Sequence, residues 1–501
     1  MVIKMFYYNK MKQKNITYKK VNYASFKNGI NTDYDEKLLP VKYATTTYNY
    51  SYQNGALKTG LGIKNLEICY DRLDRTRKKL IELPDGVEAL ATYTYTKDVN
   101  VFGEYFDMIM VYGSDKKIYA FFMYYESNTF VVLDAEFSSS PMVMNYNLNG
   151  TDSIIFATPE DGMYVWDGIG EIRKIDNAPA ITSMCMHYER MFATVATDNR
   201  SIYFSDDLDP TNWSQTLTEG GFISLADERG VCNKIVSFND YLYIFREYGI
   251  DRLVAYADQT QFQVNPLFTS STRIYVDTIK VCGDRIMFLA DDGIYYFNGL
   301  NTIKYELNIN SLFCNSCNDG AIATYYNGKY YLACNLKMPD NNIVGCESGE
   351  YKNNILIELD IRSGEFNLLR GYDILNIQTL NNRIESKMIV CIKDNGVARL
   401  GELNVSGEVF GLPTKKMWCS PKTNFGEPLR PKLIKSLTIN SDTDISIIFR
   451  SENEEKVIYM YGKKEPQTIF PNFKGKEIGI DFVCEKSIAN VSNPQVIVGV
   501  I

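Results

Sequence analysis

One hairpin pattern recurs along the middle of this chain and constrains its fold more than any other feature. A short apolar strand and a polar turn are followed by a return strand that opens on an aliphatic residue. The aliphatic residues that open these return strands are Ile118, Met163, Ile202, Ile250, Ile294, Ile357 and Val397. They recur at intervals of 39 to 48 residues, apart from one interval of 63. Propeller blades repeat about every 40–50 residues, so the period predicts an all-β protein with a β-propeller of about seven blades.

The turns of the hairpins have the chemistry of tight turns. Asp161-Gly162, Asp292-Gly293 and Asn395-Gly396 are turn pairs, because glycine adopts a positive φ at no steric cost. Between successive hairpins there is room for two more strands, which gives about four strands per blade. The long interval contains the polar segment Met338–Asn353, which is expected in a loop on one face.

The sequence pattern does not assign the strand that closes the ring, so the expected number of blades ranges from six to eight. Strands between about Leu57 and Tyr95 are expected to help close the ring. From about Gly411 the rhythm changes to alternating strands, which predicts a small C-terminal β-sandwich-like appendix. The expected domains are 1–98 (a basic arm and ring-closing strands), 99–410 (the propeller core) and 411–501 (a C-terminal β-rich domain). Two stacked β-sandwiches are the competing architecture for the whole chain.

Composition narrows the class of protein. The chain has 501 residues, of which 45% are hydrophobic, with 37 Tyr and 26 Phe, so it can bury a large β-rich core. It has no run of 18 apolar residues, and lysines interrupt each apolar stretch of Met1–Lys20, so neither a membrane span nor a signal-peptide core is expected. The 11 cysteines are expected to be free thiols, and Cys314 and Cys317 lack further metal-binding partners in the sequence.

Charge is unevenly spread along the chain. The net charge is -8, yet residues 1–85 hold 16 basic against 8 acidic residues. An acidic body argues against tight nucleic-acid binding, which needs clustered cations. The basic segment docks on an acidic partner, docks on the acidic body of another copy, or is a solvated arm. Its densest part supplies the candidate contact residues Arg75, Arg77, Lys78 and Lys79.

No enzyme signature is present in the sequence. The single histidine, His187, stands at a strand and is interpreted as structural. The recurrent acids are turn residues, namely Asp115, Asp161, Asp198, Asp291, Asp292 and Asp394. The segment Ser205–Trp213 resembles the Asp-box turn of sialidases, which is itself structural. No phosphate-binding loop or calcium repeat occurs, so no catalytic, cofactor-binding or metal-binding residue is assigned and no enzyme is expected.

Several segments carry a family resemblance. Near the N-terminus these are FKNGIN, LLP, YNY, GALK and GLG, at Phe26–Asn31, Leu38–Pro40, Tyr48–Tyr50, Gly55–Lys58 and Gly60–Gly62. In the middle they are HYERMF, IYFSD, IFREYGI and FLADDGI, at His187–Phe192, Ile202–Asp206, Ile244–Ile250 and Phe288–Ile294, with Trp213 between them. In these segments, which lie between Tyr23 and Leu300, the chain resembles the tail nozzle and packaged-DNA stabilisation proteins of short-tailed bacteriophages.

The resemblance implies a structural virion protein, made in the bacterial host cytoplasm and resident in the phage tail. Such subunits form a ring, commonly six-fold, below the portal and its adaptor, in contact with tail fibres or tip proteins. The ring surrounds a channel that retains the genome and passes it during ejection without sequence-specific binding. Two alternatives stay open: a carbohydrate- or receptor-binding propeller at the tail tip, and a cytoplasmic protein-binding scaffold.

Overall fold

The computed structural model describes residues 16–26, 29–98, 105–215, 219–225, 227–256, 259–314, 316–338, 351–382, 385–394 and 396–501. Strands make up nearly all regular structure in these ranges, and α1 (Asn310–Cys314) is a short helix among them. No helix in the described ranges is both long and apolar enough to cross a bilayer. The chain divides into two units, Leu61–Leu412 and a second one that joins Met1–Gly60 to Pro413–Ile501.

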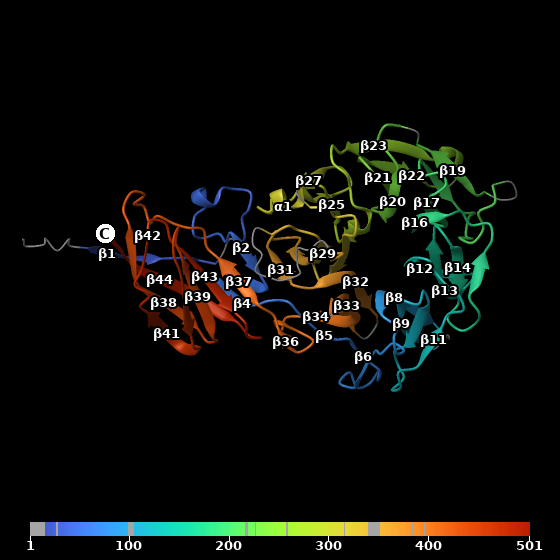
Figure 1. Ribbon diagram of the computed structural model, residues 1–501. Coiled ribbons are helices and arrows are strands. Elements are labelled where there is room, and N and C mark those ends of the chain that lie inside the picture. Colours follow the sequence, from blue (N-terminus) through green and yellow to red (C-terminus); the bar gives the residue numbers. More distant parts are fainter. Residues whose placement is uncertain are drawn as a thin grey trace, which may run out of the picture. The chain divides into compact units, whose positions relative to one another are not determined.

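Six consecutive four-stranded antiparallel sheets form most of the first unit (Figure 1). They are β8–β11 (Ala89–Asp98, Tyr105–Gly113, Ile118–Phe122, Phe130–Val132), β12–β15 (Met142–Leu148, Thr151–Thr158, Gly162–Trp166, Arg173–Ile175), β16–β19 (Ile181–His187, Arg190–Val195, Ser201–Phe204, Gly221–Ser224), β20–β23 (Cys232–Phe238, Tyr241–Arg246, Gly249–Val254, Gln263–Thr269), β24–β27 (Lys280–Cys282, Arg285–Ala290, Gly293–Phe297, Thr302–Lys304) and β28–β31 (Ile322–Tyr326, Lys329–Cys334, Ile355–Asp360, Phe366–Arg370).

The seventh blade is completed by a strand from the beginning of the unit. β32 (Asp373–Asn381), β33 (Ser386–Asp394) and β34 (Val397–Asn404) are followed by β5 (Gly62–Asn65), which pairs antiparallel with β34. Short strands β35 (Glu408–Val409) and β36 (Leu412–Pro413) extend this sheet. A Cβ on Gly401 would lie 2.2 Å from the Ile63 side chain, so this glycine allows β5 to lie close to β34. β5 falls within the segment that was expected to close the ring.

Apolar residues from facing blades fill the space between them. The first and seventh blades share a core that includes Ile109, Phe121, Leu380 and Ile389, and this contact completes the ring. All seven marker residues lie in the third strand of a blade, which confirms the blade period read from the sequence. Six of them are fully buried, whereas Val397 is 52% exposed.

The antiparallel blades give the propeller two distinct faces. First strands of neighbouring blades touch one another, for example β8 with β32 and β16 with β20, so the first strands surround the axis. We label the strands of each blade A to D outward from the axis. The A–B and C–D connections then lie on one face, called the AB/CD face. The B–C turns and the connections between blades lie on the other, called the BC/DA face.

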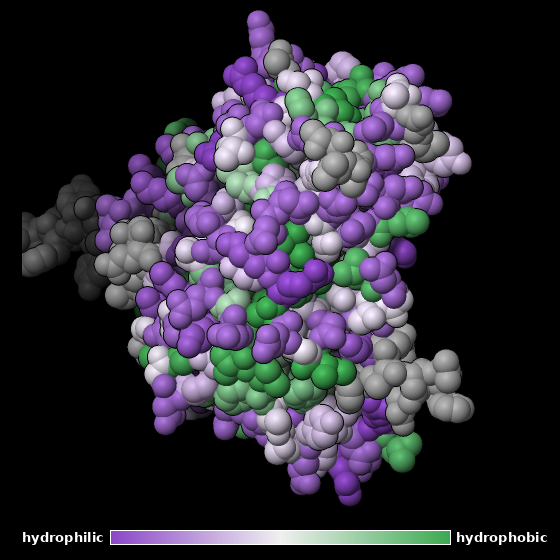
Figure 2. Space-filling model, turned by 90° about the vertical axis from the view of Figure 1, so that its right-hand side faces the viewer, coloured by the Kyte–Doolittle hydropathy of each residue, from purple (hydrophilic) through white to green (hydrophobic). Residues whose placement is uncertain are grey.

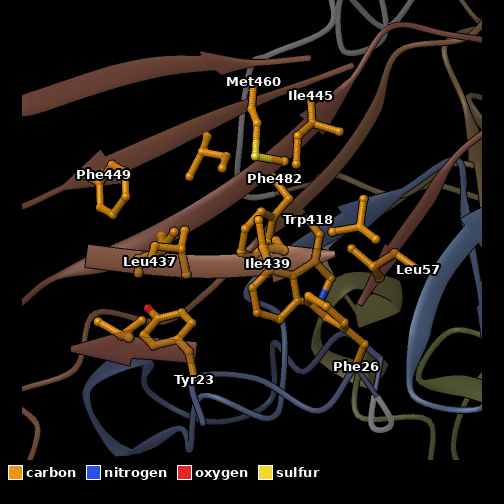
Figure 3. Packing of buried hydrophobic residues seen from close by; sticks show 14 of the residues in the cluster. Tyr23, Phe26, Leu57, Trp418, Leu437, Ile439, Ile445, Phe449, Met460 and Phe482 are labelled. Atoms are coloured by element: carbon orange, nitrogen blue, oxygen red, sulfur yellow. The ribbon is translucent and has the colours of Figure 1, made fainter. Parts of the chain in front are cut away.

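The other unit is a β-sandwich. One sheet contains β3 (Tyr50–Gln53), β4 (Ala56–Thr59), β44 (Asn490–Val500), β38 (Lys432–Ser441) and β41 (Lys463–Ile469), with β1 (Thr17–Asn22) and β42 (Phe473–Gly475) at its sides. The second contains β2 (Thr46–Tyr48), β37 (Lys416–Cys419), β43 (Gly479–Cys484), β39 (Ile445–Arg450) and β40 (Glu455–Met460). Figure 3 shows their shared core, in which Phe26 lies edge-on to Trp418, with ring centroids 5.0 Å apart.

The division into parts expected from the sequence differs from this arrangement at the N-terminal side. Residues 16–60 do not form an arm of the propeller, because Tyr50 and Leu57 are buried in the sandwich core and Leu57 pairs with Val491. β8 lies within the expected N-terminal part, yet it is the innermost strand of the first blade. The first difference arises from pairing between distant segments, which a local hydrophobic pattern does not encode, whereas β8 pairs with the next strand of the chain, β9. Most of the Met338–Asn353 insertion, and Asn395 of the third turn pair, lie outside the described residues.

Candidate assembly surface

The one histidine is packed inside the propeller. His187 ends β16, is buried, and its Nδ1 lies 2.9 Å from the Ser237 hydroxyl of β20. Its ring stands edge-on to Tyr188, with centroids 4.4 Å apart. Burial lowers the pKa of His187, so the ring is neutral at neutral pH. These contacts describe a residue that joins two blades and support its structural interpretation.

The recurrent acids hold the B–C turns together. Asp115 accepts a hydrogen bond from the Tyr119 hydroxyl at 2.6 Å. Asp161 accepts one from the Ser138 backbone at 2.7 Å and one from Thr158 at 2.8 Å. Burial acts to raise the pKa of Asp161, but these hydrogen bonds outweigh it and the pKa is lowered. The other acids of the set have similar partners: Asp198 with Tyr203, Asp291 with Tyr275, Asp292 with Lys304, and Asp394 with Arg399.

Hydrogen bonds and core packing also stabilise the Ser205–Trp213 turn. Ser205 is fully buried, and its hydroxyl accepts a hydrogen bond from the Met191 backbone at 3.0 Å. Asp209 accepts two bonds from Thr211, at 3.0 Å to the backbone nitrogen and 2.6 Å to the hydroxyl. Trp213 packs into the core between the second and third blades. Among the described residues, no group of three or more His, Cys, Asp or Glu side chains is arranged to hold a metal.

The long connection from β5 to β8 carries a two-stranded hairpin that, unlike the other connections between blades, reaches the AB/CD face between the seventh and first blades. It consists of β6 (Glu67–Cys69) and β7 (Lys78–Leu80). The Cys69 backbone donates to Glu385, in the A–B turn of the seventh blade, at 3.2 Å. On the other side, the Lys79 ammonium donates to the Phe122 and Ser127 carbonyls, both at 2.8 Å, in the C–D connection of the first blade. The hairpin is therefore fastened to both blades.

The four cations predicted as contact residues separate into two kinds. Lys79 is only 8% exposed, and desolvation lowers its pKa to about 8, so it anchors the hairpin and is not available to a partner. Arg77 is exposed and lies 3.4 Å from Asp71 and 3.6 Å from Asp74. Arg75 and Lys78 are exposed, and neither forms an ion pair with a described residue. A contact through Arg75, Arg77 and Lys78 stays a prediction.

The tip of this hairpin presents an apolar side chain that the sequence reasoning missed. Leu73 is 98% exposed. The loop beneath it is ordered by Asp71, which accepts hydrogen bonds from the backbones of Leu73 at 2.9 Å and Asp74 at 3.1 Å. A hollow of about 470 Å³ adjoins the tip and is lined by Tyr70, Asp71, Arg72, Leu73, Tyr124 and Tyr125. The lone leucine among the charges of DRLDRTRKK was the available signal.

Exposed apolar side chains in the connections are concentrated on this same face. In the described connections of the AB/CD face they are Tyr125, Ile169, Tyr188, Leu208, Tyr256, Leu300 and Val405, in addition to Leu73. On the BC/DA face the corresponding residues are Tyr248, in a B–C turn, and Val397, the first residue of β34. Figure 2 shows one side of the molecule, where apolar residues gather in a few groups within a mainly hydrophilic surface. Large exposed apolar residues on one face mark a surface that a partner can cover.

Comparison with known proteins assigns this chain to no family. No family model and no curated protein matches the chain. The extracellular domain of the putative one component system BT4673 from B. thetaiotaomicron is 11% identical with a TM-score of 0.41, covering 89% of this chain and 62% of that one. Chaetomium thermophilum Raptor is 8% identical with a TM-score of 0.44, covering 72% and 30%. PorZ of Porphyromonas gingivalis is 9% identical with a TM-score of 0.40, covering 74% and 45%. The propeller itself rests on the strand pairing described above.

Proposed function

We propose that this chain acts by assembly and not by catalysis, as the subunit of a ring in the tail of a short-tailed bacteriophage. The ring would surround the DNA channel, retain the packaged genome and pass it during ejection. Its neighbours would be further copies, the portal-side adaptor, and tail fibres or tip proteins. The observation that carries the proposal is the anchored hairpin, which presents Leu73 beside exposed cations on the apolar face.

The residues behind the family resemblance support the proposal because they determine the fold. Phe26 packs against both Trp418 and Phe482 in the sandwich core. A Cβ on Gly60 would lie 2.1 Å from the Asn49 carbonyl oxygen, so this glycine allows the two backbone segments to lie close together. The shared pattern thus covers the strands that precede β5, and β5 closes the propeller.

Charge is consistent with a channel through which DNA slides. The net charge of -8 disfavours tight binding to phosphates, so a strand in transit would meet little adhesion. Arg75 and Lys78 would then contact acidic protein surface and not DNA. A ring of identical subunits needs two different complementary surfaces on each copy, because its contacts are heterologous.

The proposal is tested by the oligomeric state and the location of the protein. Purified full-length chain is measured by mass photometry across a concentration series and imaged by electron microscopy, and purified virions are analysed by mass spectrometry. Closed rings and the presence of the chain in virions are expected. A chain that is monomeric at every concentration and absent from virions would reject the proposal.

A second function is favoured by the hollow at the hairpin tip. Tyr70, Tyr124 and Tyr125 line it together with Asp71 and Arg72, and aromatic faces beside polar groups also suit a carbohydrate ligand. Binding to an array of bacterial surface glycans that Tyr125→Ala abolishes would support a receptor-binding propeller. The absence of binding to any glycan would count against it.

A further inference from the structure

We infer that the hairpin of one subunit docks on the AB/CD face of the third and fourth blades of a neighbouring copy. This inference rests on the proposed ring and names its contact. We call the receiving surface the acceptor patch and define it by Tyr188, Glu189, Asp207, Leu208 and Tyr256. These residues come from the A–B turn and the C–D connection of the third blade and from the C–D connection of the fourth.

The apolar part of the acceptor patch is built from three exposed side chains. Tyr188 is 53% exposed, Leu208 is 64% exposed and Tyr256 is 67% exposed. The rings of Tyr188 and Tyr256 meet edge-on with centroids 5.5 Å apart, although they come from different blades. The Leu208 backbone donates to the Glu189 carbonyl at 2.9 Å, which ties the two connections of the third blade together. The patch is therefore a joined surface of the kind that an apolar side chain such as Leu73 can contact.

The backbone of the patch is held in an uncommon conformation. Tyr188 has φ +49° and Leu208 has φ +56°, a region that bulky residues rarely adopt. Such conformations cost roughly 1–3 kcal/mol each and persist where the surroundings enforce them, commonly at binding sites. The other bulky apolar residues at positive φ in the described ranges, Phe26, Phe410 and Phe425, are buried or half-buried. The acceptor patch thus combines two uncommon backbone conformations with large apolar side chains exposed to solvent.

Charge completes the match between the two surfaces. Glu189 and Asp207 are exposed at the edge of the acceptor patch. The neighbouring cation, Arg190, is buried and points inward to the Ser205 and Glu219 carbonyls, at 3.3 and 3.2 Å. The patch is thus apolar with an acidic edge, whereas the hairpin is apolar at Leu73 with Arg75 and Lys78 beside it. Opposite charges at the edge of an apolar contact guide association and fix its register.

The two surfaces cannot meet within one subunit. The hairpin is fastened between the seventh and first blades, whereas the acceptor patch lies on the third and fourth, and Figure 1 shows β6 well away from β16, β19 and β23. Two complementary surfaces on one rigid unit join copies either reciprocally, as a two-fold dimer, or head to tail, and a head-to-tail contact closes into a ring when the rotation allows.

Charge exchange between the surfaces tests the inference. Arg75→Glu with Lys78→Glu reverses the hairpin, and Glu189→Lys with Asp207→Lys reverses the patch. Each double variant is expected to weaken association by about tenfold or more in mass photometry, and the quadruple variant is expected to recover most of it. Lys116→Glu with Arg200→Glu, both exposed in turns of the BC/DA face, is the charge-matched control and is expected to associate like wild type.

The outcomes separate this contact from the proposed ring. Leu73→Ser and Leu208→Ser change exposed side chains without changing charge, and each is expected to weaken association with an unchanged melting temperature. If wild type forms rings while every variant assembles like the control, or the quadruple variant does not recover, the contact is wrong and the ring stands. If wild type forms no oligomer at any concentration, the proposed function fails and the contact with it.

Discussion

The two faces of the propeller are made from the same hairpins and yet have different surfaces. On the BC/DA face the turn acids accept hydrogen bonds from their own turns and from neighbouring segments, as Asp161 does from Thr158 and Ser138. On the AB/CD face, Leu73, Tyr188 and Leu208 extend into solvent from loops that are themselves ordered. Order in a loop that presents apolar side chains lowers the entropy cost of binding. One face thus holds the turns of the blades together, whereas the other presents apolar side chains to solvent.

The largest expected effect is on stability, and it comes from opening the propeller where β5 pairs with β34. Gly401→Val places side-chain atoms where a Cβ would already lie 2.2 Å from Ile63, so β5 must leave β34 or the blade must distort. We expect a loss of about 3 kcal/mol or more in the free energy of unfolding, measured by thermal or denaturant unfolding. Gly170→Ala, where a Cβ would make an ordinary contact at 3.4 Å, is the control. Equal stability of both variants would show that β5 does not close the ring.

The next-largest effect is expected on association, and it should differ between variants of the two faces. Leu73→Ser removes the exposed side chain at the hairpin tip, and we expect association to weaken by about 30-fold, equivalent to about 2 kcal/mol, with an unchanged melting temperature. Tyr248→Ser, on the BC/DA face, is the matched control and should assemble like wild type. Analytical ultracentrifugation measures both. A stronger effect of Tyr248→Ser would reverse the assignment of the faces.

A smaller effect is expected from the acids of the BC/DA face, and it should appear in stability alone. Asp161→Ala removes the acceptor of three hydrogen bonds from Ser138 and Thr158 and should cost about 1 kcal/mol of unfolding free energy. Because the folded pKa of Asp161 lies below its ordinary value, its contribution is present above that ordinary value and lost as the pH falls through the folded pKa. Wild-type association with reduced stability is expected. Loss of assembly at unchanged stability would contradict this assignment.

The smallest effect concerns His187, which lies beneath Tyr188 of the acceptor patch. Its folded pKa is lowered by burial, so below about pH 6.5 the unfolded chain binds the proton more readily and stability falls as the pH decreases. His187→Gln removes this dependence. Between pH 7.5 and 5.5, wild type should lose up to about 1 kcal/mol more unfolding free energy than the variant. Parallel stability curves for the two proteins would exclude a buried neutral histidine.

Sequence reasoning reached the propeller because its signal is local. A hairpin with a buried return strand repeats seven times, and residues such as Ile118 and Ile294 mark it through their burial alone. The sandwich was only partly predicted, since Leu57 pairs with Val491, far along the chain. Lys79 was misjudged as a contact residue, because its burial depends on carbonyl groups of the first blade.

The candidate surface was harder to predict than the fold. Charge in the sequence drew attention to Arg75 and Lys78, but whether a cation is exposed or buried depends on the tertiary environment. Tyr188 and Leu208 are exposed and have a positive φ, and no residue pattern for these two types predicts such a conformation. In the sequence, apolar loop residues cannot be distinguished from core residues, and their exposure becomes evident only from the two faces of the propeller.

The most direct test is a cryo-electron microscopy reconstruction of the assembled oligomer. We expect the Leu73 hairpin of each subunit to lie against Tyr188, Leu208 and Tyr256 of the next. A reconstruction in which the AB/CD face is bare and copies meet through the B–C turns would contradict it.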